Sequence, residues 1–251
     1  MIARKKGLSI ACRTMNRCIF ALTAAAILGA SGALLGSALA ETVEVAPGVE
    51  VTRKVFAAPA SEAPFFGLVE KEPTLRQTDD VFISIAVQVY GSRANVFEAL
   101  AKRGWQAIAA GDMAEAGTRL NQAWLFAPGR SPIYHGFAMI ALARFHDQEF
   151  AEELFRIARK QPGALPTLNA DYGRMLLAAN RPEDAEPILE QAVKDTPTSG
   201  DAWADLGLAR LQNGNSAGAC LAADRAEMFQ DATSANADIK RIWRDARCSG
   251  H

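Results

Sequence analysis

Few residues of this chain have a type and spacing that could support catalysis. The segment Gly214–Gly218 reads G-x-S-x-G, the pattern of a strand-to-helix turn that exposes a nucleophilic serine. Both flanks carry helical apolar spacing, and His251 is the only histidine downstream of Ser216. We therefore interpret the segment as a turn between two helices. A serine hydrolase that uses Ser216 stays as the weaker alternative.

The sequence contains no clear pattern of residues for binding a metal ion or a cofactor. The three histidines, His135, His146 and His251, have no ligand spacing of the H-E-x-x-H kind. No glycine-rich phosphate loop of the G-x-x-x-x-G-K-[ST] type occurs. The many carboxylates follow helical spacing and are typical of solvated helix faces. We expect no metal, no cofactor and no enzymatic activity.

Cys220 and Cys248 are the cysteines with the strongest structural interpretation. Cys220 is expected in the last repeated helix, and Cys248 follows the final amphipathic segment. In an oxidising compartment a disulfide between them would fix the C-terminal end of the fold. The alternative is that both cysteines are unpaired and one is buried.

A repeat organises the body of the chain. Pro128, Pro162 and Pro197 are 34 and 35 residues apart, and each follows a helical apolar pattern. Two of these patterns place alanine, leucine and alanine at identical offsets before the proline: Ala116, Leu120 and Ala123, then Ala185, Leu189 and Ala192. A fixed period of this length indicates stacked two-helix units.

The front half of each unit repeats as well. Trp203–Gly207 reads W-x-x-L-G, and Asn169–Gly173 occupies the same positions 34 residues earlier. This pattern resembles the tetratricopeptide repeat family. The resemblance covers residues 97–233 and divides them into four units: 97–130, 131–165, 166–199 and 200–233.

The resemblance implies an all-α solenoid of helical hairpins. Residues 78–96 are expected as a helical extension before the first unit, and 234–251 as a capping helix and tail. Residues 41–77 contain Pro47, Pro59, Pro64 and Pro73, so we interpret them as an extended arm or linker. Phe65, Phe66 and Leu68 form a possible docking point within it.

In the family the first helix of each repeat lines a concave groove that usually takes a peptide or a partner helix. The corresponding residues here are mostly apolar: Trp105, Ile108, His135, Met139, Leu142, Arg174, Leu177 and Leu208. The Lys, Asn and Arg clamp of chaperone-binding members is absent. This groove is predicted to bind an unknown protein or peptide. Alternatively, helix 78–90 or the arm covers it.

Residues 1–40 read as a signal peptide. A basic start precedes an uncharged, apolar stretch from Cys18 to Ala40, and Ala38 and Ala40 form a small-x-small cleavage site. Met15 is an alternative start. The chain is therefore expected to be exported to a bacterial periplasm. Alternatively, residues 18–40 stay uncleaved and anchor it in the inner membrane.

Composition limits the classes of partner. The net charge of the chain is −1, and residues 1–40 hold five basic and no acidic residues. Cleavage would make the rest more acidic, which disfavours nucleic acid as a partner. We therefore predict an exported, non-catalytic scaffold or assembly factor of the periplasm or cell envelope. An envelope-anchored structural protein is the alternative, and the oligomeric state stays open.

Overall fold

The computed structural model of the chain describes residues 41–229 and 235–250. Residues 1–40, with the expected signal peptide or anchor, lie outside this part. Among the described residues, no helix combines the length and apolarity that crossing a bilayer requires.

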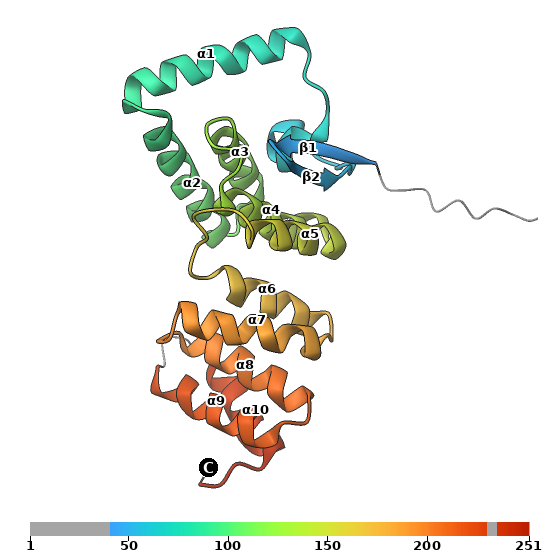
Figure 1. Cartoon of the computed structure of the whole chain (residues 1–251), viewed down its shortest axis with the longest axis vertical. Coiled ribbons are helices and arrows are strands. Elements are labelled where there is room, and N and C mark those ends of the chain that lie inside the picture. Colours follow the sequence, from blue (N-terminus) through green and yellow to red (C-terminus); the bar gives the residue numbers. More distant parts are fainter. Residues whose placement is uncertain (1–40, 230–234, 251) are drawn as a thin grey trace, which may run out of the picture. The chain divides into compact units, whose positions relative to one another are not determined.

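The body consists of consecutive antiparallel helix pairs (Figure 1). The pairs are α2 (Arg93–Ala109) with α3 (Met113–Trp124), α4 (Ser131–Phe145) with α5 (Gln148–Ala158), α6 (Leu168–Ala178) with α7 (Pro182–Asp195), and α8 (Gly200–Gln212) with α9 (Ser216–Met228). The predicted all-α solenoid of helical hairpins is confirmed. The predicted start of the first unit, residue 97, lies within α2.

Short polar side chains start the second helix of three pairs. The carboxylates of Asp112 and Asp147 accept hydrogen bonds from the backbone of Glu115 and Phe150, both at 3.0 Å. The side chain of Asn215 accepts one from Gly218 at 2.9 Å. Each cap satisfies a backbone N–H that has no partner within its own helix. The tight turns between paired helices are therefore encoded locally.

Small residues let paired helices approach closely. A Cβ atom added to Gly104 of α2 would lie 2.8 Å from the side chain of Leu120 on α3. At Gly173 of α6 an added Cβ would lie 2.5 Å from Leu189 on α7. Both distances are below van der Waals contact, so glycine is required where the leucine of the second helix crosses the first.

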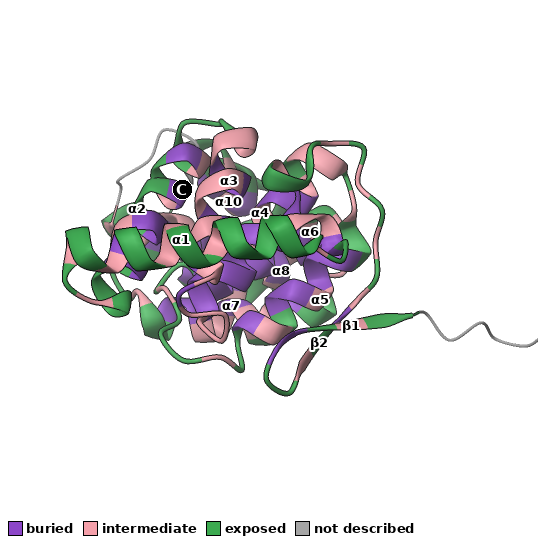
Figure 2. Cartoon of the chain, turned by 90° about the horizontal axis from the view of Figure 1, so that it is seen from above, coloured by how far each residue is buried: buried purple, intermediate pink, exposed green. Residues whose placement is uncertain are grey.

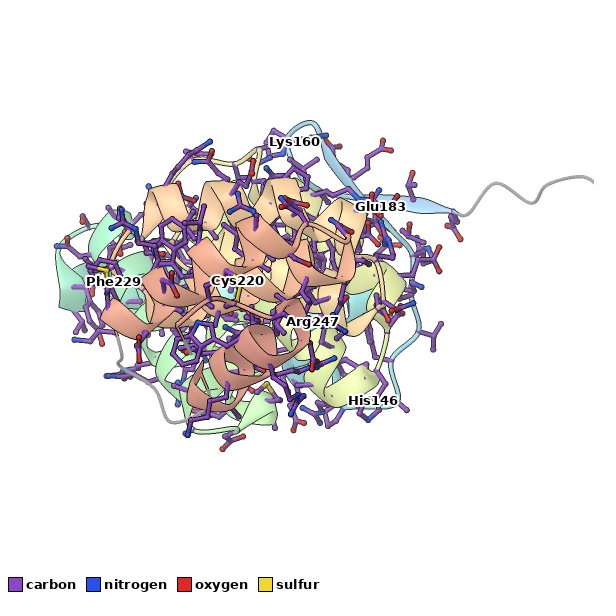
Figure 3. The ribbon with its side chains drawn as sticks, turned by 90° about the horizontal axis from the view of Figure 1, so that it is seen from below. His146, Lys160, Glu183, Cys220, Phe229 and Arg247 are labelled. Carbon is purple, nitrogen blue, oxygen red and sulfur yellow. A yellow bond between two sulfur atoms is a disulfide. The ribbon has the colours of Figure 1, made fainter. Side chains whose placement is uncertain are left out.

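Helix α10 (Ala235–Ala246) covers the last pair. Ile239 and Ile242 are buried against α8 and α9. A disulfide joins Cys220 of α9 to Cys248, with 5.6 Å between their Cα atoms. Figure 3 views this end of the chain from below, with Cys220 labelled on α9 and Arg247 directly after α10. The last repeat is thus closed by both packing and a covalent bond.

Helix α1 (Pro73–Tyr90) precedes the repeats and packs against α2. It begins five residues before the predicted boundary at Thr78. Pro73 is its first residue, a position where the missing N–H of proline costs no hydrogen bond. Leu75, Ile85 and Val89 are more than half exposed, and Figure 2 shows α1 with much of its surface exposed.

The arm folds into short elements. Strands β1 (Thr42–Ala46) and β2 (Val49–Thr52) form an antiparallel hairpin. It is followed by two short 3₁₀ segments, η1 (Ala60–Glu62) and η2 (Pro64–Leu68). The indole N–H of Trp124 on α3 donates to the carbonyl of Val45 at 3.0 Å. The hairpin is therefore tied to the first repeat.

Residues 60–68, here called the docked segment, are held by Asn121 of α3. The Asn121 amide donates to the carbonyls of Ser61 and Ala63 at 2.9 and 2.7 Å. Its oxygen accepts from the N–H of Phe66 at 3.0 Å. Since Asn121 is fully buried, the segment supplies all of these partners in place of water.

The docked segment also packs closely against α3 and α4. The Phe65 ring lies 4.7 Å from Phe137 and 5.8 Å from Tyr134, measured between centroids. A Cβ atom at Gly117 of α3 would collide with the backbone of Glu62. Phe65 and Leu68 are buried and Phe66 is half-buried, so the arm packs against the repeats at the three residues expected as its docking point.

Candidate binding groove

The first helices of the four pairs form one row. Helix α2 contacts α4, and α6 contacts α8. Between them, the imidazole Nε2 of His135 on α4 lies 2.9 Å from a carboxylate oxygen of Asp171 on α6. This contact connects the two halves of the row.

His135 is the buried centre of the first half of the row. Its side chain is fully buried, and its ring lies 4.5 Å from the Trp105 ring of α2 in an edge-to-face arrangement. In the described part of the chain its Nδ1 atom has no hydrogen-bond partner. His135 was expected on the groove surface. It instead lies beneath it, where it positions Asp171.

Arg174 links the second half of the row. Its guanidinium lies 3.6 Å from Asp171 of the same helix and 3.1 Å from Oδ2 of Asp205 on α8. Arg174 is the only arginine or lysine among the predicted groove residues. The structure pairs that cation with two carboxylates, so Arg174 leaves no net positive charge there.

Asp205 is almost completely buried, with 8% of its surface exposed. Burial raises the pKa of Asp205 to about 6, although Arg174 opposes this shift. The charges of Asp201 and Asp238 add to the rise in pKa. The three carboxylates therefore act on one another across a shared space.

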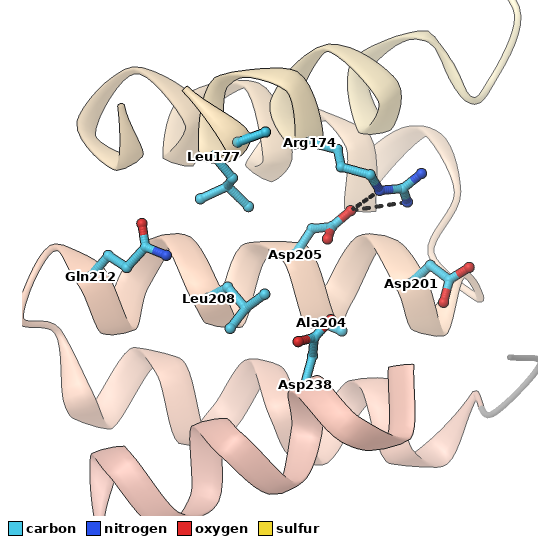
Figure 4. A pocket seen from close by; sticks show the side chains of 9 residues that line it. Arg174, Leu177, Asp201, Ala204, Asp205, Leu208, Gln212 and Asp238 are labelled. Atoms are coloured by element: carbon cyan, nitrogen blue, oxygen red, sulfur yellow. Dashed lines mark hydrogen bonds and ion pairs between the residues drawn. The ribbon is translucent and has the colours of Figure 1, made fainter. Parts of the chain in front are cut away.

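That space is a pocket of about 530 Å³ between α6, α8 and α10. Leu177 and Leu208 extend into it from α6 and α8, and Asp238 reaches it from α10 (Figure 4). Asp201 and Asp205 complete its acidic lining. The capping helix thus contributes a charged group to the groove.

A second pocket, of about 410 Å³, lies beside Trp105. It is lined by α2, the start of α4 and the loop before α6. The Arg130 guanidinium lies over the Phe97 ring at 5.2 Å and 3.6 Å from Glu98. The indole nitrogen of Trp105 is buried and has no acceptor within the described residues. This pocket is more basic than the first.

The predicted groove residues therefore separate into distinct sets. Trp105 lines the second pocket, whereas Arg174, Leu177 and Leu208 line the first. Three further predicted residues are half-buried, pack against the core and line neither pocket: Ile108, Met139 and Leu142. Neither pocket includes residues of α1 or of the arm.

Sequence reasoning missed three of the acids at the groove, Asp171, Asp205 and Asp238. Asp171 and Asp205 are 34 residues apart and occupy equivalent positions in consecutive repeats. This recurrence was visible in the sequence, but acidic residues on helices were interpreted as solvated faces. Asp238 carries no such signal, because it belongs to the capping helix outside the repeat.

The other candidate chemistry has a structural explanation. Gly214–Gly218 forms the turn from α8 into α9, where Asn215 is the cap and Ser216 is the first helical residue. A nucleophilic serine of this motif would follow a strand. Over residues 41–229 and 235–250, no group of three His, Cys, Asp or Glu side chains is placed to hold a metal ion.

Comparisons with known proteins support the fold. A family description, tetratricopeptide repeat, matches residues 166–211. The structure of PilF from Pseudomonas aeruginosa is 20% identical and superposes with a TM-score of 0.55 over 62% of this chain and 71% of that one. YrrB, a TPR protein with an unusual peptide-binding site, is 13% identical, with a TM-score of 0.51 over 67% and 85%. No curated protein matches.

Proposed function

We propose, from the premise that this chain belongs to the tetratricopeptide repeat family, that it is a scaffold that binds a segment of a partner protein along its row of first helices. Repeats of this family generally mediate contacts between proteins. YrrB, which shares the fold, has a peptide-binding site. The partner of this chain is a protein or peptide of unknown identity.

One observation carries the proposal. Contacts between named side chains join the four first helices, from Trp105 through His135, Asp171 and Arg174 to Asp205. The pocket at the end of this series has both apolar and charged lining. A rigid row with an open, chemically mixed pocket suits recognition of a peptide segment.

We also propose that the chain is non-catalytic. The interhelical position of Ser216 supports this proposal, since the serine hydrolase alternative needs a strand before it. A serine-reactive fluorophosphonate probe should leave the purified protein unlabelled. Specific labelling of Ser216 would favour the hydrolase.

Export to the bacterial periplasm is the third part of the proposal. The residue pattern of 1–40 supports it, and so does the Cys220–Cys248 disulfide, because disulfides persist in oxidising compartments. N-terminal sequencing of the protein from its native cells should start at Glu41. Retention of residues 18–40 would favour the membrane-anchored alternative.

Affinity purification with matched variants tests the scaffold function. Leu208→Glu places a charge inside the pocket, whereas Leu221→Glu places one on α9 at a leucine that is 67% exposed. Both variants should keep the helicity and melting temperature of the wild type. A partner lost only with Leu208→Glu supports binding in the groove, and a partner retained by both variants contradicts it.

A further inference from the structure

The pocket between α6, α8 and α10 carries more acid than base. Its lining contains three carboxylates, Asp201, Asp205 and Asp238, and a single cation, Arg174. Arg174 pairs with Asp205 and with Asp171 beside the pocket. Across the described ranges, Asp201 and Asp238 have neither a hydrogen bond nor an ion pair through their side chains. Two carboxylates of the pocket therefore have no direct partner, although Arg174 also acts on Asp201 electrostatically.

Asp205 contributes a free acceptor atom to the same pocket. Its side chain is 12% exposed, and both contacts of the Arg174 guanidinium go to the same oxygen, Oδ2 (Figure 4). Within the part of the chain that the structure describes, Oδ1 accepts no hydrogen bond. Oδ1 is not among the buried atoms that lack a partner, so it is accessible from the pocket. Half of this carboxylate is available to a donor that enters the pocket.

The apolar part of the lining limits what that donor can be. Leu177 and Leu208 extend into the pocket from α6 and α8, and Ala204 lies between the acidic residues. Arginine and lysine side chains combine an aliphatic stem with a cationic end, so the stem can cover apolar surface while the charge reaches carboxylates. A small inorganic cation would leave the leucines uncovered.

We propose that this pocket binds an arginine or lysine side chain of the partner segment. This inference rests on the proposed scaffold function and names the chemistry of its ligand. The stem of the basic side chain packs between Leu177 and Leu208. Its charged end lies between Asp201 and Asp238 and donates to Oδ1 of Asp205. Arg174 holds Asp205 in place and excludes acidic segments from the same position.

The position of Asp238 adds a structural requirement. It is the only one of the three acids that comes from α10, and α10 is tied to α9 through the disulfide and through its isoleucines. The pocket is complete only while the capping helix is docked. Recognition of a basic side chain is therefore a property of the closed C-terminal end of the repeat array.

Three nine-residue peptides provide the test. Each has capped ends and leucine-rich flanks, and they differ only in the central residue, which is arginine, its neutral isostere citrulline or glutamate. Fluorescence anisotropy of labelled peptides with the full folded protein measures the dissociation constant at neutral pH. We expect the arginine peptide to bind about tenfold more tightly than the citrulline peptide, since a charge pair in a part-buried site is screened little by solvent. The glutamate peptide should bind most weakly.

A pair of double variants locates the effect. Asp201→Asn with Asp238→Asn should abolish the preference for arginine over citrulline. Glu149→Gln with Glu183→Gln removes the same charge from exposed positions outside the pocket and should leave the preference unchanged. Equal losses in both pairs would mean that overall charge drives binding, which overturns the proposal.

The remaining outcomes separate this inference from the scaffold function. If all three peptides bind equally and Leu208→Glu abolishes binding, the groove binds peptides but the basic side chain is not recognised. A preference for glutamate overturns the inference in the same way. If none of the peptides binds, the basic-residue inference fails, while the affinity purification with Leu208→Glu and Leu221→Glu decides the scaffold function separately.

Discussion

Asp171 and Asp205 are 34 residues apart, occupy the same position in consecutive repeats, and both contact the guanidinium of Arg174. This arrangement joins α6 to α8 on the side that carries the pocket. The same Asp171 carboxylate group also meets His135 of the preceding repeat. The contacts among His135, Asp171, Arg174 and Asp205 therefore connect successive helix pairs. This set contains two carboxylates and one permanent cation.

The charge of Asp205 makes stability depend on pH. The pKa of this side chain is about 6 in the folded protein and 3.8 in a model peptide. Between these values the folded state binds more protons than the unfolded state, so raising the pH lowers the free energy of unfolding. Asp205→Asn should therefore be more stable than the wild type at pH 7, by up to about 3 kcal/mol.

The difference between Asp205→Asn and the wild type should shrink as the pH falls from 7 to 4. Denaturant unfolding at a series of pH values measures it. Asp171, Asp201 and Asp238 face the same region and stay unchanged in both proteins. The exposed variant Glu183→Gln is the control. A stability difference that is constant over this range would contradict the assignment of a buried, charged Asp205.

Asn121 is predicted to be essential for docking of residues 60–68. Asn121→Leu keeps a similar volume but removes three hydrogen bonds and leaves two carbonyls and one N–H without partners. The expected loss is about 2–4 kcal/mol in the free energy of unfolding. Gln122→Leu, at the neighbouring half-buried position, should cost less than about 1 kcal/mol. Equal losses of stability in the two variants would contradict the role of Asn121 in holding residues 60–68.

The effect of Gly117→Ala on stability should depend on the arm. The substitution should be unfavourable when the arm is present and favourable when it is absent. In the full protein the added methyl group collides with the Glu62 backbone, so residues 60–68 should detach and become sensitive to protease. In a chain that starts at residue 73 the same substitution meets no arm. It should then stabilise α3 by about 1 kcal/mol, because alanine is the better helix former. Stabilisation in both chains would show that the arm is not docked at α3.

The disulfide is predicted to stabilise the last repeat. It closes a separation of 28 residues between Cys220 and Cys248, which corresponds to about 3–4 kcal/mol on the chain-entropy account. Reductant should lower the melting temperature of the wild type. It should leave the double variant Cys220→Ser, Cys248→Ser unchanged. A wild type that is insensitive to reductant, with the bond shown to be reduced by mass spectrometry, would contradict this contribution.

The repeat itself could be predicted because residue types at short, regular spacings determine it. The spacing of Pro128, Pro162 and Pro197 marks the ends of units, and glycines such as Gly173 mark where paired helices cross. The same logic failed at Pro73, which was interpreted as part of a linker. Proline interrupts a helix only in its interior, and Pro73 is the first residue of α1.

The site was less predictable, because burial and pairing depend on contacts between repeats. His135 has the helical position of a groove residue, yet the rings of Trp105 and Phe155 enclose it. Arg174 lies on the first helix of its repeat, but the pairing of its charge depends on Asp171 and on Asp205 of the next repeat. The docked segment depends on Asn121, which contacts residues about 55 to 60 positions away. No local pattern encodes that distance.

Photo-crosslinking from the pocket tests the central claim most directly. A photoreactive residue at position 208, on the pocket wall, is compared with the same residue at position 221, which is exposed on α9. The account predicts that position 208 forms a reproducible crosslink to one partner segment in native cells, that this segment contains arginine or lysine, and that position 221 does not. A partner that crosslinks from position 221 and not from position 208 would contradict binding in the groove.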